Sequence, residues 1–409
     1  MDKMHTPFGE LDRLPIEDSP MDMARRFQAR RGFVFLDSGV ATKDALSVVA
    51  FEPEREWKGS IFSFDDKKNL RAALNALGSC GGLFGSIHFD GSFSFGTYKN
   101  ILVYRHADRV WGGTSLPTNV KASVTPPPFS IDPFHPLVSR EEFIASVQRV
   151  KDYIAAGDIY QVCLSYPWEA KFSGNPWTFY EKLRHHSPAP HAAFLRTSTE
   201  VVASASPETF LKMHGRHIIT KPIKGTRPRA TDPKQDADFA RELKVSHKEN
   251  AELLMITDLE RNDLGQICDY HSVHVSSLNA LEHFAQVHHL VSTVEGRLRE
   301  EVTHIDALSA CFPGGSISGA PKRRALEIIR ALEKYPRGLY TGAIGYLGVH
   351  EESQFSIAIR TAEFASGIAR YFSGGGIVID SDPEAEWEET RIKARSLPHF
   401  SYEDACLNV

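Results

Sequence analysis

Apolar residues recur at helical spacing in the segment SREEFIASVQRVKDYIAAGD. Spacings of four, three and four separate its apolar side chains, which are Phe143, Val147, Val150 and Ile154. This spacing places all four on one face of an α-helix, and a following glycine is a common stop signal. The pattern predicts an amphipathic helix that ends near Gly157.

The rest of the chain contains both helix-like and strand-like patterns of apolar residues. The helical period, with apolar positions three and four residues apart, returns in KKNLRAALNALG, AELLMITDLERN and GAPKRRALEIIRALEKYP. Short β-branched and aromatic runs predict strands in GFVFLDSG, GLFGSIHF and NILVYRHADRVWGG. The run QFSIAIRTAEFASGIARYFSGGGIVIDS predicts a hairpin of two long strands. In HIITKPIKGTRPR, Pro222 is expected to stop a strand, which places Lys224 near a strand end.

Prolines interrupt the pattern between residues 114 and 139. The segment carries Pro117, Pro126, Pro127, Pro128, Pro133 and Pro136. Neither a helix nor a central strand tolerates this density, so we predict a boundary here between an N-terminal subdomain over 1–125 and a second region over 126–409, interleaved in one fold. Helices do not alternate strictly with strands, which favours an α+β fold with largely antiparallel sheets.

Composition narrows the class of protein. The 409 residues are 42% hydrophobic and 24% charged, which is typical of a globular chain, and the formal net charge is −5. No global basic field favours nucleic acid or an anionic membrane surface, and no segment has the apolar run of a signal peptide or a membrane span. The five cysteines are odd in number and form no C-x-x-C pair, which predicts a cytoplasmic protein.

Two pairs of carboxylates are candidate ligands of a hard cation. Glu249 and Glu252 are three residues apart in one predicted helix, and Glu386 and Glu389 are three apart in another. This spacing puts each pair on one helical face, and clustered carboxylate oxygens suit Mg²⁺. The alternative is that each pair is a solvated helix face.

Glycines and one arginine are candidates for binding an anion. FPGGSISGAPKRRALEII runs a Gly/Ser loop into a helix with Pro321 in its first turn, which would leave backbone N–H groups free. Gly374 to Gly376 lie inside a predicted strand, where glycines indicate either a bulge or the close approach of another group. Arg360 lies among small and apolar residues, where a guanidinium requires a carboxylate partner.

Ten motifs together resemble one family. The chain resembles the chorismate-utilising enzymes, a family that includes anthranilate, aminodeoxychorismate, isochorismate and salicylate synthases, over residues 139 to 397. The motifs occur in the family's order: GDIYQVCLS, SASPETF, KPIKGTRPR, MITDLERNDLG, HHLVSTVEG, SGAPKRRALEII, RGLYTGAIGYLG, FSIAIRT, GGGIVIDS and EWEETRIKA. The resemblance implies two packed antiparallel sheets with helices outside and a central substrate cleft.

The resemblance also implies how chorismate, which carries two carboxylates, would be held. Mg²⁺ is expected against the ring carboxylate, with Glu252 and Glu389 as direct ligands and Glu249 and Glu386 acting through water. The enolpyruvyl carboxylate is expected at Arg360, Tyr340 and the backbone of Gly376. The ring carboxylate is expected near Gly315, Ser316 and Gly374.

Catalytic roles follow from the same resemblance. Glu208 matches the general acid that protonates the departing C4 hydroxyl, and His289 matches an active-site histidine. Gln161 stands where isochorismate and salicylate synthases have a lysine base, so those activities are disfavoured. Lys224, in PIKGT, matches the lysine that attacks C2 in aminodeoxychorismate synthases, where anthranilate synthases resemble PIAGT. The attacking amine must be neutral, and we expect Lys221, Arg227 and Mg²⁺ to lower the pKa of Lys224.

The expected activity is therefore that of aminodeoxychorismate synthase component I. The chain shows no Cys-His-Glu glutaminase arrangement, so a separate glutamine amidotransferase is expected to supply ammonia. Two alternatives stay open: anthranilate synthase component I, and a relative that binds chorismate without turnover.

Overall fold

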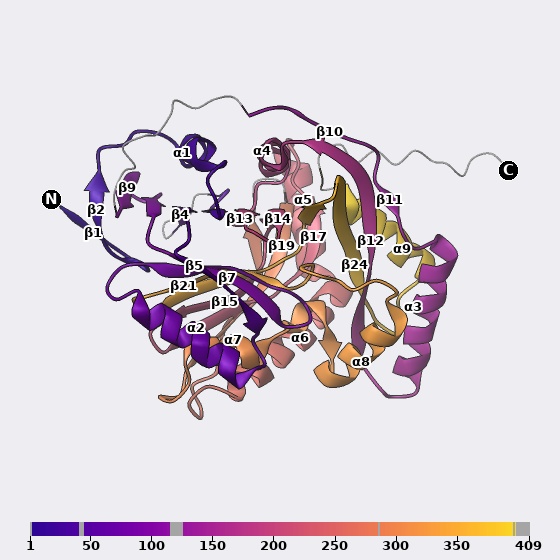
Figure 1. Cartoon of the computed structure of the whole chain (residues 1–409). Coiled ribbons are helices and arrows are strands. Elements are labelled where there is room, and N and C mark those ends of the chain that lie inside the picture. The colour runs from indigo at the N-terminus through magenta and orange to yellow at the C-terminus, as the bar shows by residue number, and fades with distance from the viewer. Residues whose placement is uncertain (1, 41–44, 115–125, 285–286, 396, 398–409) are drawn as a thin grey trace.

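The computed structural model describes residues 2–40, 45–114, 126–284, 287–395 and 397. Within these residues the strands form one sheet of 14 strands and one of 10 strands, here called the larger and the smaller sheet (Figure 1). The strands along both sheets pair antiparallel, as in the long pairing of β12 with β24 and in that of β21 with β22. The predicted fold class, α+β with two antiparallel sheets, is confirmed.

The larger sheet combines strands from both ends of the chain. Its order is β1 (Lys3–Thr6), β2 (Gly9–Leu14), β9 (Val110–Gly113), β8 (Ile101–Arg105), β4 (Leu46–Ala50), β3 (Phe33–Asp37), β13 (His191–Arg196), β14 (Val201–Ser206), β23 (Thr361–Ala365), β24 (Ile368–Ile377), β12 (Gln161–Gly174) and β10 (Phe129–Ile131). Two short strands, β11 (His135–Pro136) and β20 (Gly319–Ala320), also pair with β12.

The smaller sheet is built in the same mixed way. Its order is β17 (Ile223–Pro228), β19 (Val287–Arg297), β16 (His217–Lys221), β15 (Thr209–His214), β22 (Glu352–Ile357), β21 (Ala343–Gly348), β6 (Gly82–Ile87), β7 (Ser92–Tyr98) and β5 (Arg55–Ser60), with β18 (His274–His283) paired to β19. Strands from the first 113 residues thus occur in both sheets. The subdomain boundary at residue 125 stays a prediction, and residues 115–125 lie outside the described residues.

Helices cover the outer faces of both sheets. They are α1 (Pro20–Phe27), α2 (Phe64–Ala76), α3 (Arg140–Ala155), α4 (Pro176–His186), α5 (Pro233–Val245), α6 (His247–Gly265), α7 (His304–Cys311), α8 (Lys322–Leu332) and α9 (Pro383–Ala394), with a 3₁₀ turn at Gly315–Ile317. Helices α1, α3, α4, α8 and α9 pack on the larger sheet, and α2, α6 and α7 pack on the smaller one. The result is a four-layer arrangement (Figure 1).

A separate apolar core lies between the sheets. Val34, Val48 and Val103 of the larger sheet pack with Phe84 and Ile344 of the smaller sheet. These side chains are between 0% and 2% exposed, so water is excluded from the interface between the layers. Burial of this apolar surface holds the two sheets face to face.

The predicted helix after the proline-rich segment is confirmed as α3. Ser139 caps it by accepting the backbone N–H of Glu142, whose side chain accepts the backbone N–H of Ser139 in return. Such a capping box satisfies two backbone donors that the first helical turn leaves free. Phe143, Val147 and Val150 form the buried face, as their spacing predicts.

One prediction about strands is wrong. The run from Gln354 to Ile377 is not one hairpin, because its first arm is divided between β22 of the smaller sheet and β23 of the larger sheet. The hairpin itself consists of β23 and β24. The prediction for Pro222 is confirmed, since β16 ends at Lys221 and Lys224 is the second residue of the next strand, β17.

Two of the places where the chain changes sheets lie side by side. The chain passes from the larger to the smaller sheet between β14 and β15, and returns between β22 and β23. We call these two segments, residues 205–209 and 357–361, the paired crossover. They are joined by hydrogen bonds from Ser206 Oγ to Ile357 O at 2.6 Å, from Ile357 N to Glu208 O at 3.1 Å and from Ala205 N to Arg360 O at 3.0 Å.

Candidate active site

Glu208 lies on the first arm of the paired crossover with its carboxyl group buried. The residue is 5% exposed, and its carboxylate accepts hydrogen bonds from the Ser316 hydroxyl and from the backbone N–H of Ile223. Burial raises the pKa of Glu208 to about 7, against the opposing effects of Ser316, Lys224 and Arg360. A carboxyl with this pKa is partly protonated at neutral pH and can serve as a general acid.

Arg360 lies on the second arm, with a backbone φ of 51°. Within the described part of the chain, its guanidinium has no hydrogen-bond or ion-pair partner. Burial lowers the pKa of Arg360, while the neighbouring Tyr371 and Glu208 act in the opposite direction. A buried guanidinium without a partner is suited to bind a carboxylate in a bidentate manner.

Lys224 projects from β17 at a bulge. The register between β17 and β19 shifts between Lys224 and Thr226, and Gly225 has a φ of +69°. A glycine adopts this left-handed conformation without steric cost, and bulges re-aim the side chains beside them. A Cβ atom on Gly225 would lie 2.6 Å from Leu243 Cδ1, so the site also requires a glycine for space.

The Lys224 amine reaches across to the larger sheet. A Cβ atom placed on Gly376 of β24 would lie 3.3 Å from Lys224 Nζ and 2.6 Å from Gln161 Nε2. Gln161 is fully buried, and its Oε1 atom has no hydrogen-bond partner among the described residues. The two sheets therefore bring Lys224, Gln161 and the backbone of Gly376 together.

The pKa of Lys224 differs from the expectation. Burial lowers it, but the surrounding acidic groups outweigh burial and raise the pKa overall; they are Cys163, Glu252, Glu208 and Glu389. The two cations expected to lower it have partners of their own. Lys221 lies 3.7 Å from Glu282, and Arg227 is paired with Glu242 at 2.9 Å.

His289 contributes a hydrogen-bond acceptor to the same region. Its Nδ1 atom lies 3.0 Å from Gly225 O, which can only accept, so Nδ1 carries the proton. The ring is 2% exposed, and Nε2 has no partner among the residues described. Burial lowers the pKa of His289 to about 4, and Arg360 acts in the same direction. The neutral imidazole thus has an Nε2 lone pair that accepts no hydrogen bond from the described residues.

The loop Gly315–Ser316 borders Glu208 on another side. Ser316 bonds to the Glu208 carboxylate, and the thiol of Cys163 donates to Ser316 O at 3.3 Å. The Gly315 N–H is not free for an anion, as the sequence suggested, because it donates to Glu260 Oε1 at 2.9 Å. Pro321 is the N-cap residue of α8 rather than a member of its first turn.

Tyr340 and the glycines of β24 complete the predicted binding residues. Tyr340 is 9% exposed and stacks on Phe372, with ring centroids 5.2 Å apart. The pairing of β24 with β12 runs in unbroken register, so the glycines mark close approach and not a bulge. A Cβ atom on Gly374 would lie 2.3 Å from Leu164 O.

The four predicted metal ligands come from two helices. Glu249 and Glu252 lie on α6, and Glu386 and Glu389 lie on α9. Lys248 joins the helices, with its Nζ 4.0 Å from Glu252 Oε1 and 3.9 Å from Glu386 Oε1. Burial raises the pKa of Glu252 and that of Glu386, whereas Lys393, 2.7 Å away, lowers the pKa of Glu389.

The chemistry of this donor set fits Mg²⁺. All four groups are carboxylates, and Mg²⁺ is usually held by one or two protein carboxylates together with waters and substrate oxygens. Among the residues that the structure describes, no group of three or more His, Cys, Asp or Glu side chains is arranged to hold a metal ion. The magnesium site, with Glu252 and Glu389 as direct ligands, stays a prediction.

Sequence reasoning missed two sets of buried charges around the site. Arg337 is 3% exposed and directs its donors to Glu333, Cys163 O, Ile317 O and Thr341 Oγ1. Arg337, paired with Glu333, thereby joins the start of β12 to the loop at Gly315–Ile317. Glu260 and Asp263 of α6 form the second set. The spacing of these residues in the sequence does not distinguish buried charged side chains from solvent-exposed ones.

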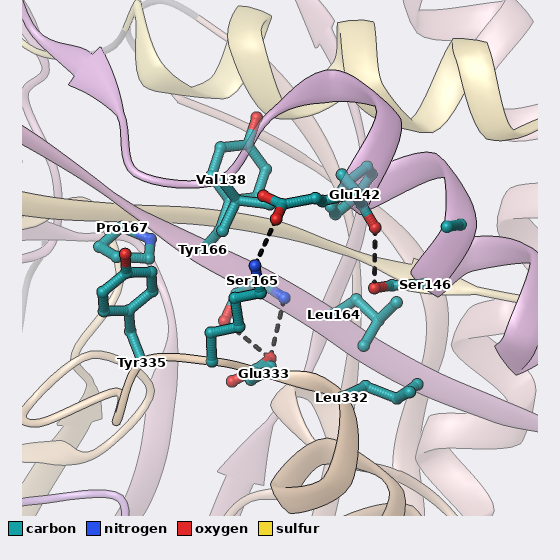
Figure 2. Close-up of a pocket in the computed structure, with 13 residues that line it drawn as sticks. Val138, Glu142, Ser146, Leu164, Ser165, Tyr166, Pro167, Leu332, Glu333 and Tyr335 are labelled. Atoms are coloured by element: carbon teal, nitrogen blue, oxygen red, sulfur yellow. Dashed lines mark hydrogen bonds and ion pairs between the residues drawn. The ribbon is translucent and has the colours of Figure 1, made fainter.

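A cavity of about 240 Å³ lies elsewhere, at the edge of β12 (Figure 2). Residues of α3, β12 and the segment after α8 line it. Glu333 accepts the Ser165 N–H at 2.9 Å, and Lys334 pairs with Glu142. None of the predicted site residues lines the cavity, so it is separate from the region around Glu208.

Comparison with known proteins identifies the family. The model of the chorismate binding enzyme family matches residues 40–399, which is most of the 409 residues. The chain belongs to this family. No helix within the described ranges is long and apolar enough to cross a membrane.

Curated relatives include two activities. The chain is 33% identical to anthranilate synthase component 1 of Methanothermobacter thermautotrophicus, over 88% of this chain and 86% of the relative. It is 44% identical to anthranilate synthase component 1 of Thermus thermophilus, over 63% of this chain and 56% of the relative. It is 46% identical to aminodeoxychorismate synthase of Streptomyces griseus, over 63% of this chain and 36% of the relative. The match thus spans about half of the Thermus relative and about a third of the Streptomyces relative.

Solved structures share the fold. Anthranilate synthase component I from Streptococcus pneumoniae superimposes with a TM-score of 0.75 at 29% identity, over 88% of this chain and 93% of that one. The isochorismate synthase MenF from Escherichia coli superimposes with a TM-score of 0.79 at 17% identity, over 94% and 92%. The second similarity concerns the fold alone.

Proposed function

We propose that this chorismate binding enzyme is component I of an aminodeoxychorismate synthase, which converts chorismate and ammonia to 4-amino-4-deoxychorismate and water. The product would lead to p-aminobenzoate and folate. The observation that carries the proposal is Lys224, a partly buried amine without a hydrogen-bond partner in the described chain, aimed between Gln161 and Gly376. An amine in this place can act as a nucleophile toward a substrate held in the cleft.

The reaction would proceed in two displacements. The amine of Lys224, whose raised pKa keeps it protonated at neutral pH, must first lose a proton. The neutral amine then attacks C2 of chorismate, the ring double bond shifts, and the C4–oxygen bond breaks. Glu208 gives its proton to the departing hydroxyl, which leaves as water. The positively charged nitrogen on C2 then loses a proton, ammonia attacks C4, and the double bond shifts back. The Lys224 nitrogen takes up a proton as its bond to C2 breaks, and the nitrogen added at C4 loses one. Buried Glu208, with a pKa of about 7, suits the acid role.

Substrate binding would use the residues that the fold brings together around Glu208. Arg360, Tyr340 and the backbone of Gly376 would hold the enolpyruvyl carboxylate, and the unpartnered guanidinium supports this role. Ser316, with the backbone of the neighbouring Gly315 and that of Gly374, would face the ring carboxylate.

Other polar atoms would complete the cleft. Nε2 of neutral His289 can accept a hydrogen bond from ammonia or from a substrate hydroxyl. Glu252 and Glu389, with Glu249 and Glu386 through water, would hold Mg²⁺. When bound, the ion supplies positive charge against the ring carboxylate.

Anthranilate synthase component I is the second candidate, because the relative aligned over most of this chain carries that activity. The two reactions differ in the ring carbon that receives nitrogen. Lys224 favours amination at C4, since occupation of C2 by the lysine directs ammonia to C4. A direct addition of ammonia at C2 would not require an amine in the wall of the cleft.

The decisive experiment is an assay of the purified chain with chorismate, ammonium and Mg²⁺. Conversion of the product to p-aminobenzoate by an added aminodeoxychorismate lyase is the expected result. Fluorescent anthranilate without the lyase would favour the second candidate. Binding of chorismate without turnover would indicate a non-catalytic relative.

The lysine nucleophile has its own test. Intact-mass measurement with chorismate but without ammonia should show a covalent adduct on the wild type and none on Lys224→Ala. The variant should lose 4-amino-4-deoxychorismate and release any product as the 2-amino isomer. A Lys224→Ala enzyme that forms 4-amino-4-deoxychorismate at the wild-type rate would disprove the nucleophile role.

The nitrogen source is proposed to be a separate glutamine amidotransferase. Several relatives are named component 1 of a synthase, including aminodeoxychorismate synthase component 1 of Bacillus subtilis. The purified chain should therefore use ammonium but not glutamine, and efficient use of glutamine by the chain alone would contradict this proposal.

A further inference from the structure

Glu260 is a buried carboxylate to which the proposed reaction assigns no role. It lies on α6, eight positions after Glu252, and is 3% exposed. Its Oε1 atom accepts the backbone N–H of Gly315 at 2.9 Å, and its Oε2 atom lies 3.5 Å from the Thr220 hydroxyl. Glu260 therefore joins α6 to the loop that borders Glu208.

The contact between this loop and α6 is close. A Cβ atom on Gly315 would lie 2.8 Å from Leu259 Cδ2 and 3.0 Å from Glu260 Oε1. The next residue, Ser316, donates its hydroxyl hydrogen bond to Glu208. Glu260, Gly315, Ser316 and Glu208 thus form a continuous series of contacts from the helix to the proposed acid.

We propose that Glu260 is a positioning residue of the active site: by holding the Gly315 N–H, it keeps the Ser316 hydroxyl on Glu208 and the loop in place for the substrate's ring carboxylate. The roles of Glu208 and of the carboxylate rest on the proposed function. The position of the loop does not.

The charges around Glu260 support this assignment. Asp263, one turn further along α6, pairs with Lys322 at 2.5 Å, and Lys322 also donates to Cys311 O at 3.0 Å. The segment between α7 and α8 is thereby attached to α6 near both of its ends. Burial, together with Asp263 and Glu208, raises the pKa of Glu260 to about 7, against the opposing effect of Lys322.

Two substitutions separate positioning from general stability. Glu260→Gln keeps a carbonyl oxygen that can accept the Gly315 N–H, whereas Glu260→Met keeps the length of the side chain but removes the acceptor. Asp258→Asn, at an exposed side chain on the same helix, is the matched control. Hydrogen exchange of peptides covering residues 314–318 should be about tenfold faster in the Met variant and unchanged in the Gln and Asn variants.

Kinetics provide the second readout. The Met variant should raise the KM for chorismate about tenfold, the size of a lost hydrogen bond to a charged group, while Gln stays within about twofold. The Gln variant should also move the bend of the kcat/KM profile near pH 7 to lower pH, because it removes a negative charge near Glu208, whose other charged neighbours are Lys224 and Arg360.

The outcomes are distinguishable. Equal impairment of the Gln and Met variants, or wild-type exchange and KM in the Met variant, would overturn the positioning role. If the Met variant does not fold, the Gln variant still tests the role: exchange at residues 314–318 or a KM that departs more than about twofold from the wild type overturns it, because Gln keeps the acceptor for the Gly315 N–H. If the wild type forms no 4-amino-4-deoxychorismate, the proposed function fails, and exchange at residues 314–318 still decides the role of Glu260.

Discussion

Substitution of Gly376 by alanine tests the geometry of the cleft most directly. The added Cβ atom would lie 2.6 Å from Gln161 Nε2 and 3.3 Å from Lys224 Nζ. Cβ atoms essentially never approach within 3.0 Å and ordinary contact begins at 3.4 Å, so the Gln161 amide must move by about 0.4–0.8 Å. A misplacement of about 1 Å in an active site costs roughly a hundredfold in rate, or about 2.7 kcal/mol of transition-state stabilisation.

We expect Gly376→Ala to fold normally and to lower kcat/KM for chorismate about a hundredfold. Turnover of ammonium would be followed by the lyase-coupled assay, and adduct formation by intact mass. Gly265→Ala is the control, because no atom lies within 4 Å of its added Cβ. Wild-type kcat/KM in a folded Gly376→Ala enzyme would refute the placement of Gln161 and Lys224 around this backbone.

Three further predictions concern charged residues. The kcat/KM for chorismate should rise with pH up to about 7 and level off above it, because the neutral Lys224 becomes more abundant as pH rises while burial raises the pKa of Glu208 to about 7 and only protonated Glu208 can donate; a profile that keeps rising steeply through pH 7 would contradict the acid role, and Glu208→Gln should abolish turnover. Glu389→Gln and EDTA should each abolish turnover with an unchanged circular dichroism spectrum, and activity in EDTA would exclude the metal. Arg337→Met should lower the free energy of unfolding in urea by about 3–5 kcal/mol, because Glu333 stays buried without its partner. Arg370→Met, at a more exposed pair, should cost less than about 1 kcal/mol, and equal losses would refute the reasoning.

Local patterns predicted α2, α3, α6, α8 and α9 and many of the strands, but not α1, α4, α5 or α7. The face of α3 and its cap at Ser139 are both visible in the sequence, because their determinants lie within four residues of one another. The division of the run around Arg360 is not visible. Its residues have the composition of a strand throughout. The break is marked by the backbone φ of 51° at Arg360, where the chain passes from one packed sheet to the other.

The candidate site was predicted mainly through the family resemblance. The glycines of β24 indicated close approach on physical grounds, but which atoms approach depends on the pairing with β12 and on β17 of the other sheet. The expected effect of Lys221 and Arg227 on Lys224 was wrong because their acidic partners come from distant segments. No local pattern in the sequence indicated a role for Glu260, because its partner Gly315 lies 55 residues away.

The paired crossover has a consequence for how one scaffold can support several reactions. Glu208 and Arg360 are carried on two backbone segments tied directly to each other, so the span between them is set by main-chain hydrogen bonds rather than by rotamers. Lys224 and Gln161 come from other strands, which reach the cleft independently. Under the proposed function, substitutions at those strands would change which atom attacks the ring without moving Glu208 and Arg360, so the chemistry and the substrate affinity could evolve separately.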